Sequence, residues 1–493
     1  MRIGAKALRG FFYTLASGYV ARVASVALTF LIRRQLGPGV FANAVLGITL
    51  FMLLSSLREF GLPHALLHFQ EQVEEFVGTH LLLNLALTAA SSLLSCLVAG
   101  ILWLCWPAVV SSTVAAVVCT LSALHLLRNA TLTSESLLRL EFEFGRLSLY
   151  HGLATMLALG VALATARQGW GTWSLVLGGW STFSVFSVVY VVVFSAGVWT
   201  ARPLPLRRLS FSLPWARRLM RYGLWIWVGW MLQSFVWWYD KLAVRLLVGS
   251  AELALYENAW WLVQLPTAII TAIIFTYTNA LYSRYQKDRQ KLGQLFARMA
   301  SLIVRVSSPL ALVLVLNSRE ILAVIPEWLR SAPIIVWLAG YAFLRPLLDD
   351  GMGLLWAVGD TRAGAGVVVW QAAVAAVAVP AAGWYWGVNG VAASMGLVAA
   401  VGVVGLVRAL RPHVDVAWGR VLAAPAVALL VSAAVALAYG RVPAPFLPGV
   451  PLVRSGLMLL AYGAVLLALE RRRLVETVRE ALAAVRHNEG AGD

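Results

Sequence analysis

The sequence predicts an all-α polytopic membrane protein with about fourteen transmembrane helices. Of its 493 residues, 60% are apolar and only 12% are charged, whereas soluble globular proteins average roughly 45–50% apolar and 25% charged residues. The apolar residues also form runs of about 17–25, which is the length of helix that crosses a hydrocarbon layer of ~30 Å. The segments between these runs are too short for a soluble catalytic domain.

Fourteen apolar runs are long enough to cross the membrane as helices. The first seven lie at residues 11–32, 41–57, 79–106, 109–127, 147–165, 172–197 and 222–239. The other seven lie at residues 253–280, 298–316, 333–356, 364–386, 388–408, 418–439 and 451–469. The run at 253–280 is longer than one span requires, so we expect it to tilt or to contain a break.

The basic residues give the orientation in the membrane. A net charge of +17 is large enough for a nucleic-acid partner, but the basic residues follow the membrane instead. With the N-terminus inside, 27 Lys and Arg residues fall in cytoplasmic segments and nine fall in outside loops. The positive-inside rule then predicts that both termini are cytoplasmic, and no nucleic acid is expected as a partner. The first apolar run is too long for a signal peptide, so we interpret it as an uncleaved helix.

Two turns in the chain repeat one design. Residues 33–44 combine a basic residue, a glycine-containing turn and an Asn-Ala pair, and residues 245–259 repeat this order. Six helices separate the copies, so both enter the membrane in the same direction and predict two six-helix lobes, as parallel repeats, around a central cavity. The predicted parts are an N-lobe at 1–197, a basic cytoplasmic hinge at 198–221, a C-lobe at 222–410, two extra helices at 411–469 and an amphipathic cytoplasmic tail at 470–493 that lies on membrane lipids.

Four short stretches, in this order, resemble the oligosaccharide flippases of the polysaccharide transporter family, which belongs to the MOP flippase superfamily. The stretches are Arg34-Gln35-Leu36-Gly37-Pro38 with Phe41; Leu57-Arg58-Glu59-Phe60-Gly61-Leu62 with Ala65-Leu66; Asp240 through Tyr256 leading to Gln264-Leu265-Pro266; and Glu327-Trp328 with Gly387-Val388-Asn389-Gly390-Val391-Ala392. The resemblance extends over about residues 5–410. It departs from the family pattern at Ala42 and Ala254, where both copies of the repeat usually carry glycine.

This resemblance implies a transporter and not an enzyme. The implied substrate is an undecaprenyl-pyrophosphate-linked oligosaccharide, flipped from the inner to the outer leaflet of the bacterial cytoplasmic membrane by alternating access. Polysaccharide assembly proteins are the implied partners, and no cofactor is implied. A lipid II flippase, a small-molecule exporter of the MATE kind and, with less support, a membrane glycosyltransferase or polymerase are the alternatives.

Arginines inside predicted helices are the candidate substrate ligands. A charged side chain in a span faces protein or water because its exposure to lipid is costly. Arg22 shares its helix face with Ser25 and Thr29, and Arg305 has serines on its own face. Each arginine either lines a cationic cavity for a pyrophosphate or belongs to a structural ion pair. Arg58, at the cytoplasmic end of the second helix, is expected to add positive charge to the same cavity.

Two further groups complete the predicted site. Glu257, Trp261 and Gln264 share one face of the eighth helix, where they are expected to contact the substrate. In the tenth helix, Arg345, Asp349 and Asp350 surround Pro346, which predicts a kink. This cluster is either a proton or sodium site for energy coupling or a structural pair of Arg345 with Asp349.

No metal or cofactor site is predicted. The chain contains neither a GxxxxGK[ST] phosphate-binding loop nor HExxH or GxSxG motifs, so ATP hydrolysis and the commoner hydrolase mechanisms lack support. His64 and His68 have helical spacing with Glu71 and Glu75, but we interpret these four residues as a solvated cytoplasmic face.

Overall fold

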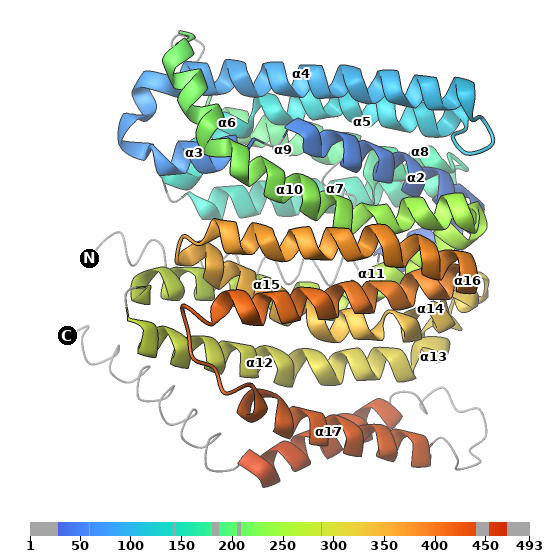
Figure 1. The fold of residues 1–493 in the computed structure, drawn as a ribbon. Coiled ribbons are helices and arrows are strands. Elements are labelled where there is room, and N and C mark those ends of the chain that lie inside the picture. Colours follow the sequence, from blue (N-terminus) through green and yellow to red (C-terminus); the bar gives the residue numbers. More distant parts are fainter. Residues whose placement is uncertain are drawn as a thin grey trace. The chain divides into compact units, whose positions relative to one another are not determined.

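The computed structural model of the chain describes residues 28–58, 60–141, 143–179, 187–204, 209–286, 288–439 and 453–470. Within these ranges the regular secondary structure consists of α-helices and short 3₁₀ turns, without a strand (Figure 1). Arg22 and all of the predicted amphipathic tail at 470–493 except its first residue lie outside the described residues.

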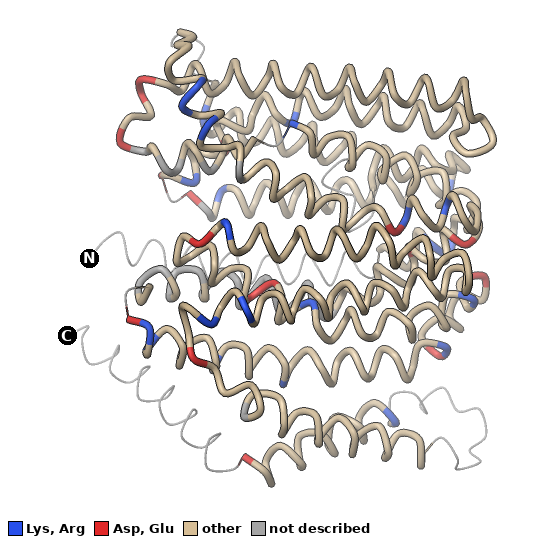
Figure 2. Tube along the Cα trace, in the orientation of Figure 1, with Lys and Arg blue, Asp and Glu red and all other residues tan. Residues whose placement is uncertain are grey.

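Eight helices in the described part of the chain are long and apolar enough to span a membrane. A ninth candidate is a pair bent by 60°, Pro326–Trp337 with Ala339–Ala357. The predicted membrane-protein class is therefore confirmed, while the number fourteen stays a prediction. The charged residues of the described helices gather mostly toward the helix ends (Figure 2), as expected when the helix middles face hydrocarbon.

The first of two compact units comprises Met1–Trp261 and Thr361–Val398. Helices α4 and α5 pack side by side (Figure 1), α2 packs on α5 and α10, and α7 packs on α8 and α9. The elements of this region are α2 (Pro38–Ser55), the 3₁₀ turn η1 (Ser56–Arg58), α3 (Leu62–His68), η2 (Gln70–Gln72), α4 (Val73–Cys105), α5 (Ser112–Ala130), α6 (Leu132–Leu140), α7 (Phe144–Arg167), α8 (Thr172–Gly178), α9 (Val188–Ala201), α10 (Leu213–Leu247) and the start of α11 (Ser250–Tyr285).

The second compact unit comprises Leu262–Asp360 and Ala399–Asp493. Within it, α12 packs on α15 and α17. Its further elements are α12 (Arg289–Leu316), α13 (Ser318–Leu322), η5 (Pro326–Ser331), α14 (Ala332–Trp337), α15 (Ala339–Ala357), α17 (Trp418–Tyr439) and a last described helix, Val453–Glu470. The lobes at 1–197 and 222–410 stay a prediction, because compactness groups helices by packing in one conformation and not by internal repeat.

Helix α16 (Thr361–Leu410) is two helices joined at a glycine. Gly387 has φ 61° and ψ −145°, a conformation that other residues rarely adopt. The Gln371 side-chain amide donates a hydrogen bond to the Val398 carbonyl at 3.3 Å, so the two halves return alongside each other. The predicted runs at 364–386 and 388–408 therefore correspond to the two arms of a hairpin.

Two other predicted runs differ from single straight helices. The run at 172–197 contains α8 and α9, which are separate elements. In the run at 333–356, the bend lies at Leu338, between α14 and α15. α15 continues as one helix through Pro346, and the kink expected at that proline stays a prediction.

The predicted orientation can be tested with reporter fusions. Reporters placed after Arg208 and after Arg289 are expected to be cytoplasmic, and a reporter after Gly169 is expected on the outside, because the basic residues concentrate in the first two segments. Dual alkaline phosphatase and fluorescent-protein fusions measure this directly. A reversal of one site relative to the others would contradict the fourteen-span topology.

Candidate functional site

Arg58 lies in the turn that connects α2 and α3. The 3₁₀ turn η1 ends at this residue. Gly61 then adopts a left-handed conformation, with φ 60°, immediately before α3 begins. A left-handed backbone is strained for residues with a Cβ. This explains why the Leu57–Leu62 stretch carries a glycine at position 61. The turn brings the Arg58 side chain to α5.

Two polar groups of α5 hold the Arg58 guanidinium. Its Nη1 donates to Asn129 Oδ1 at 2.8 Å, and its Nη2 contacts His125 Nε2. Asn129 is itself fixed, because Asn84 of α4 donates to its carbonyl at 2.7 Å. Since arginine stays protonated, His125 accepts at Nε2 and is neutral in this arrangement. Arg58 therefore has a defined direction.

The Arg58 turn also packs against α10. Trp227 Nε1 donates to the Leu57 carbonyl at 2.9 Å, and its ring stacks on Phe60 at 4.8 Å between centroids. A Cβ at Gly223 would lie 1.8 Å from the Phe60 carbonyl oxygen. Only glycine at position 223 permits this close approach. The Leu57–Leu62 stretch, which carries part of the family resemblance, therefore packs directly against α10.

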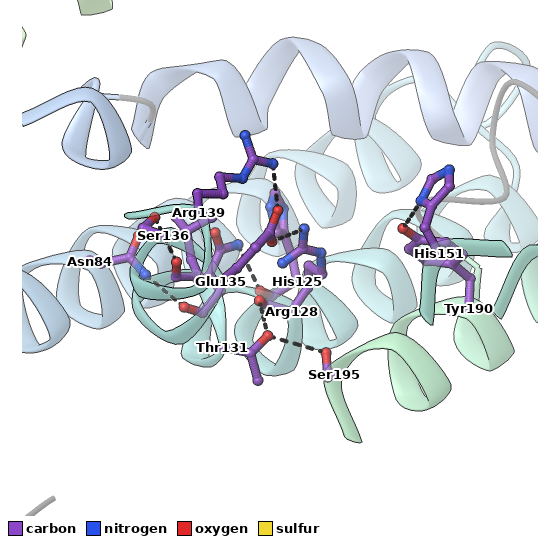
Figure 3. Close-up of polar contacts among 12 residues, drawn as sticks. Asn84, His125, Arg128, Thr131, Glu135, Ser136, Arg139, His151, Tyr190 and Ser195 are labelled. Carbon is purple, nitrogen blue, oxygen red and sulfur yellow. Dashed lines mark hydrogen bonds and ion pairs between the residues drawn. The ribbon is translucent and has the colours of Figure 1, made fainter. Parts of the chain in front are cut away.

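An ion-pair cluster lies next to this turn, at the junction of α5 and α6 (Figure 3). Glu135 is buried, and its two oxygens each accept from one arginine, Arg128 and Arg139, at 2.6 Å. The Arg128 guanidinium also lies over the Phe194 ring, 4.7 Å from its centroid. Glu135 therefore joins α5 and α6, and its charge balances one of the two arginines.

The structure buries four charged side chains together in the first unit. We name Arg33, Asp240, Lys241 and Glu257 the buried quartet; each is at most 2% exposed. Lys241 Nζ lies 3.8 Å from Asp240 Oδ1 and 3.6 Å from Glu257 Oε2. The Tyr256 hydroxyl donates to Asp240 Oδ2 at 2.6 Å. Breaking a buried ion pair typically costs about 3–5 kcal/mol, so the four charges depend on one another.

Aromatic rings surround the two cations of the buried quartet. Lys241 Nζ lies 4.8 Å from the Trp238 ring centroid and 4.6 Å from that of Trp260. The Arg33 guanidinium lies 4.2 Å from the Trp261 ring centroid. Cation–π contacts in such desolvated sites are worth about 2 kcal/mol. Trp261 therefore contacts Arg33 here, and its predicted role toward a sugar stays a prediction.

Sequence reasoning singled out Glu257 but missed Arg33, Asp240 and Lys241. Their signal was present, because the first of the two repeated turns begins at Arg33 and the resembling stretch of the second begins at Asp240. The repeat predicts two lobes around a cavity, but it does not by itself predict that charged side chains of the two copies meet. Gln264 follows on α11, half-buried, in the second unit.

Arg305 forms an ion pair with the last described helix. Its Nη2 lies 2.5 Å from Glu470 Oε2, and Glu470 is 5% exposed. Near the other end of that helix, Arg454 donates to Asn317 and to Glu320 at 2.7 Å. The structural ion pair considered for Arg305 is present, and a role in substrate binding stays a prediction.

The Arg345 cluster lies within the second unit. Arg345 Nη2 and Asp349 Oδ1 are 2.7 Å apart, so the expected pair is present. Asp350 is buried, and Tyr282 of α11 donates to both of its oxygens, at 3.0 and 3.2 Å. The neighbouring aspartates thus differ: Asp349 has a cation as its partner, and Asp350 has the Tyr282 hydroxyl. Among the described residues no group of three His, Cys, Asp or Glu side chains is arranged to hold a metal ion.

Comparisons with known proteins agree with this architecture. Residues 31–333 match the family described as "Polysaccharide biosynthesis protein". The Teichuronic acid biosynthesis protein TuaB of Bacillus subtilis (strain 168) is 27% identical over 122 residues, which are 24% of this chain. The match spans a quarter of the length of that relative.

Two solved structures are similar in fold. The lipid II flippase MurJ, in an inward closed conformation, aligns with a TM-score of 0.72 at 11% identity over 94% of this chain and 99% of its own. An inward-facing multidrug resistance MATE family transporter of the MOP superfamily aligns with a TM-score of 0.54 at 15% identity, over 82% of this chain and 94% of its own. At these identities the likeness concerns the fold alone. The chain therefore belongs to the polysaccharide biosynthesis protein family and has the all-helical fold of MurJ and MATE transporters.

Proposed function

We propose that this chain is a flippase that moves an undecaprenyl-pyrophosphate-linked oligosaccharide from the inner to the outer leaflet by alternating access. The observation that carries the proposal is the combination of a polysaccharide biosynthesis family match with a MurJ-like fold over 94% of the chain. A transporter fold by itself fits many substrates, and the family narrows them to intermediates of polysaccharide synthesis. The membrane would be the bacterial cytoplasmic membrane, with both termini inside.

The second candidate is a lipid II flippase, which the likeness to MurJ in fold favours. Both substrates carry a pyrophosphate between a polyprenol and a sugar, so the same cationic groups would serve either one. Deletion of the gene separates the candidates. Loss of a surface polysaccharide with accumulated lipid-linked repeat units supports the proposal, whereas cell lysis without a polysaccharide defect supports lipid II. Drug sensitivity as the sole phenotype would instead indicate a MATE-like exporter.

A cationic cavity is the core of the proposed mechanism. Two phosphate charges cannot be buried without compensation, and Arg22 and Arg58 are the residues proposed to supply it. Arg58 is supported by its fixed direction, which His125 and Asn129 impose. Arg305, Glu257, Trp261 and Gln264 are proposed to join the substrate path in conformations in which their present contacts open.

Energy coupling is proposed for Arg345, Asp349 and Asp350. Asp349→Asn should reduce transport in vesicles and blunt its response to a proton or sodium gradient, because an amide can neither titrate nor balance Arg345. Transport with and without an imposed gradient measures this. Asp415→Asn is the matched control, since Asp415 is an exposed partner of Arg289 in the same unit. An unchanged gradient response in folded Asp349→Asn protein would assign the cluster to structure.

A further inference from the structure

The buried quartet has a balanced formal charge. Arg33 contributes one positive charge from the helical residues 28–35, α10 contributes Lys241 and Asp240, and α11 contributes Glu257. Among the described residues, the charged side chains that act on Glu257 are these three, and the Tyr256 hydroxyl donates to Asp240. Two cations and two carboxylates sum to zero. A buried group of charges is tolerated when it is paired and neutral overall.

Glu257 differs from Asp240 in its hydrogen bonds. Asp240 accepts the Tyr256 hydroxyl at 2.6 Å, which favours its charged form. Neither Glu257 oxygen accepts a hydrogen bond from the described residues, and Lys241 Nζ lies 3.6 Å from its Oε2. Of the two carboxylates, Glu257 therefore gives up less hydrogen bonding to its charged form when it takes up a proton.

We propose that Glu257 is a proton-binding site that controls whether the buried quartet is closed or open to water. One proton on Glu257 leaves Arg33, Lys241 and Asp240 with a net charge of +1 in a dry environment. An unbalanced buried cation favours any conformation in which water or an anion reaches it. The helical residues 28–35, α10 and α11 then separate around the quartet. This step needs no lipid substrate and goes beyond the proposed flipping activity.

The sequence repeat supports a switch at the buried quartet. Arg33 begins the first copy of the repeated sequence, residues 33–44, and Glu257 belongs to the second copy, residues 245–259. The quartet brings the two copies together, because Arg33 and Glu257 interact electrostatically within it. On the predicted topology both turns lie at the outer side. Opening of the quartet would then expose Arg33 and Lys241 on the side where the substrate is released.

Cysteine accessibility tests the proposal. The probe is Ala254→Cys, with Cys96, Cys105 and Cys119 replaced by alanine. Ala254 is fully buried and precedes Glu257 by three residues on the same helix face. A water-soluble maleimide should label this probe slowly at neutral pH and several-fold faster at acidic pH. A variant that keeps only the exposed Cys105 corrects for the pH dependence of the reagent.

Two substitutions separate charge balance from lost contacts. Glu257→Gln imitates the protonated state and should give fast labelling at every pH. Adding Lys241→Met restores a neutral cluster of Arg33 and Asp240, so labelling should return toward the slow rate. Glu252→Gln, the same change earlier on α11, should behave like the parent. All variants are compared as folded protein after size-exclusion chromatography.

The outcomes decide between a proton site and a purely structural cluster. The proposal is overturned if acid does not speed labelling of the parent, or if the double variant labels as fast as Glu257→Gln. The parent titration requires no change in the quartet, so it remains informative even where a variant fails to fold. Because labelling is measured without lipid-linked sugar, its result is independent of whether flipping itself is observed.

Discussion

Arg22→Ala is expected to abolish transport while leaving expression and folding intact. Arg22 lies in the middle of the first predicted span, and Gly18, Ser25 and Thr29 share its face. If this face lines the cavity, the substitution leaves the pyrophosphate without its principal counter-charge. Arg22→Lys should keep partial activity, because a point charge still attracts phosphate but lacks the bidentate fork of arginine. Transport of lipid-linked sugar in vesicles measures both variants.

Arg167→Ala is the matched control, because Arg167 is exposed at the end of α7. Cysteines placed at 22, 25 or 29 should react with water-soluble thiol reagents, and lipid-linked substrate should protect them. Normal transport by Arg22→Ala, together with an inaccessible cysteine at 22, would make this arginine a structural residue.

Gly390→Ala is expected to prevent stable folding. A Cβ at this position would lie 2.0 Å from the Ala382 carbonyl oxygen and 2.6 Å from its carbon. The clash is with backbone across the hairpin of α16, so no side-chain rotation relieves it. Overpacking of a core typically costs about 1–3 kcal/mol and sometimes more, and here the two arms must separate. Thermal unfolding in detergent and the yield of monodisperse protein are the measurements.

Gly366→Ala serves as the control on the same helix. Nothing lies within 4 Å of the Cβ that this change would add, and alanine is the better helix former. Stability should therefore stay the same or rise. If Gly390→Ala unfolds at the same temperature as Gly366→Ala, the tight hairpin is not the native arrangement.

The membrane class and most helices could be predicted from the sequence because hydrophobicity over a whole span is a strong physical signal. Gly387 also marked the end of one predicted run and the start of the next, and the structure places the hairpin break there. The bend at Leu338 gave no such signal. No proline or glycine occupies that position, and a break fixed by packing between helices is invisible to local pattern.

The candidate site was predicted in part. The Arg345–Asp349 pair follows from helical spacing alone, and the structure contains it at 2.7 Å. The partner of Arg305 could not be predicted, because Glu470 is 165 positions away along the chain. The buried quartet was predicted less completely than its sequence signal allowed: the repeated stretches contain Arg33 and Glu257, but only the fold shows that these distant side chains lie in one cluster.

Reconstitution of the purified chain into liposomes tests the central claim most directly. Undecaprenyl-pyrophosphate-linked oligosaccharide would be placed in one leaflet, and its exposure to a membrane-impermeant glycosidase on the opposite side would be followed over time. The flippase proposal predicts that the folded protein makes the lipid-linked sugar accessible from both sides and that Arg22→Ala protein does not. Sugar that stays in its original leaflet in the presence of folded, unsubstituted protein, with or without an ion gradient, would contradict the proposal.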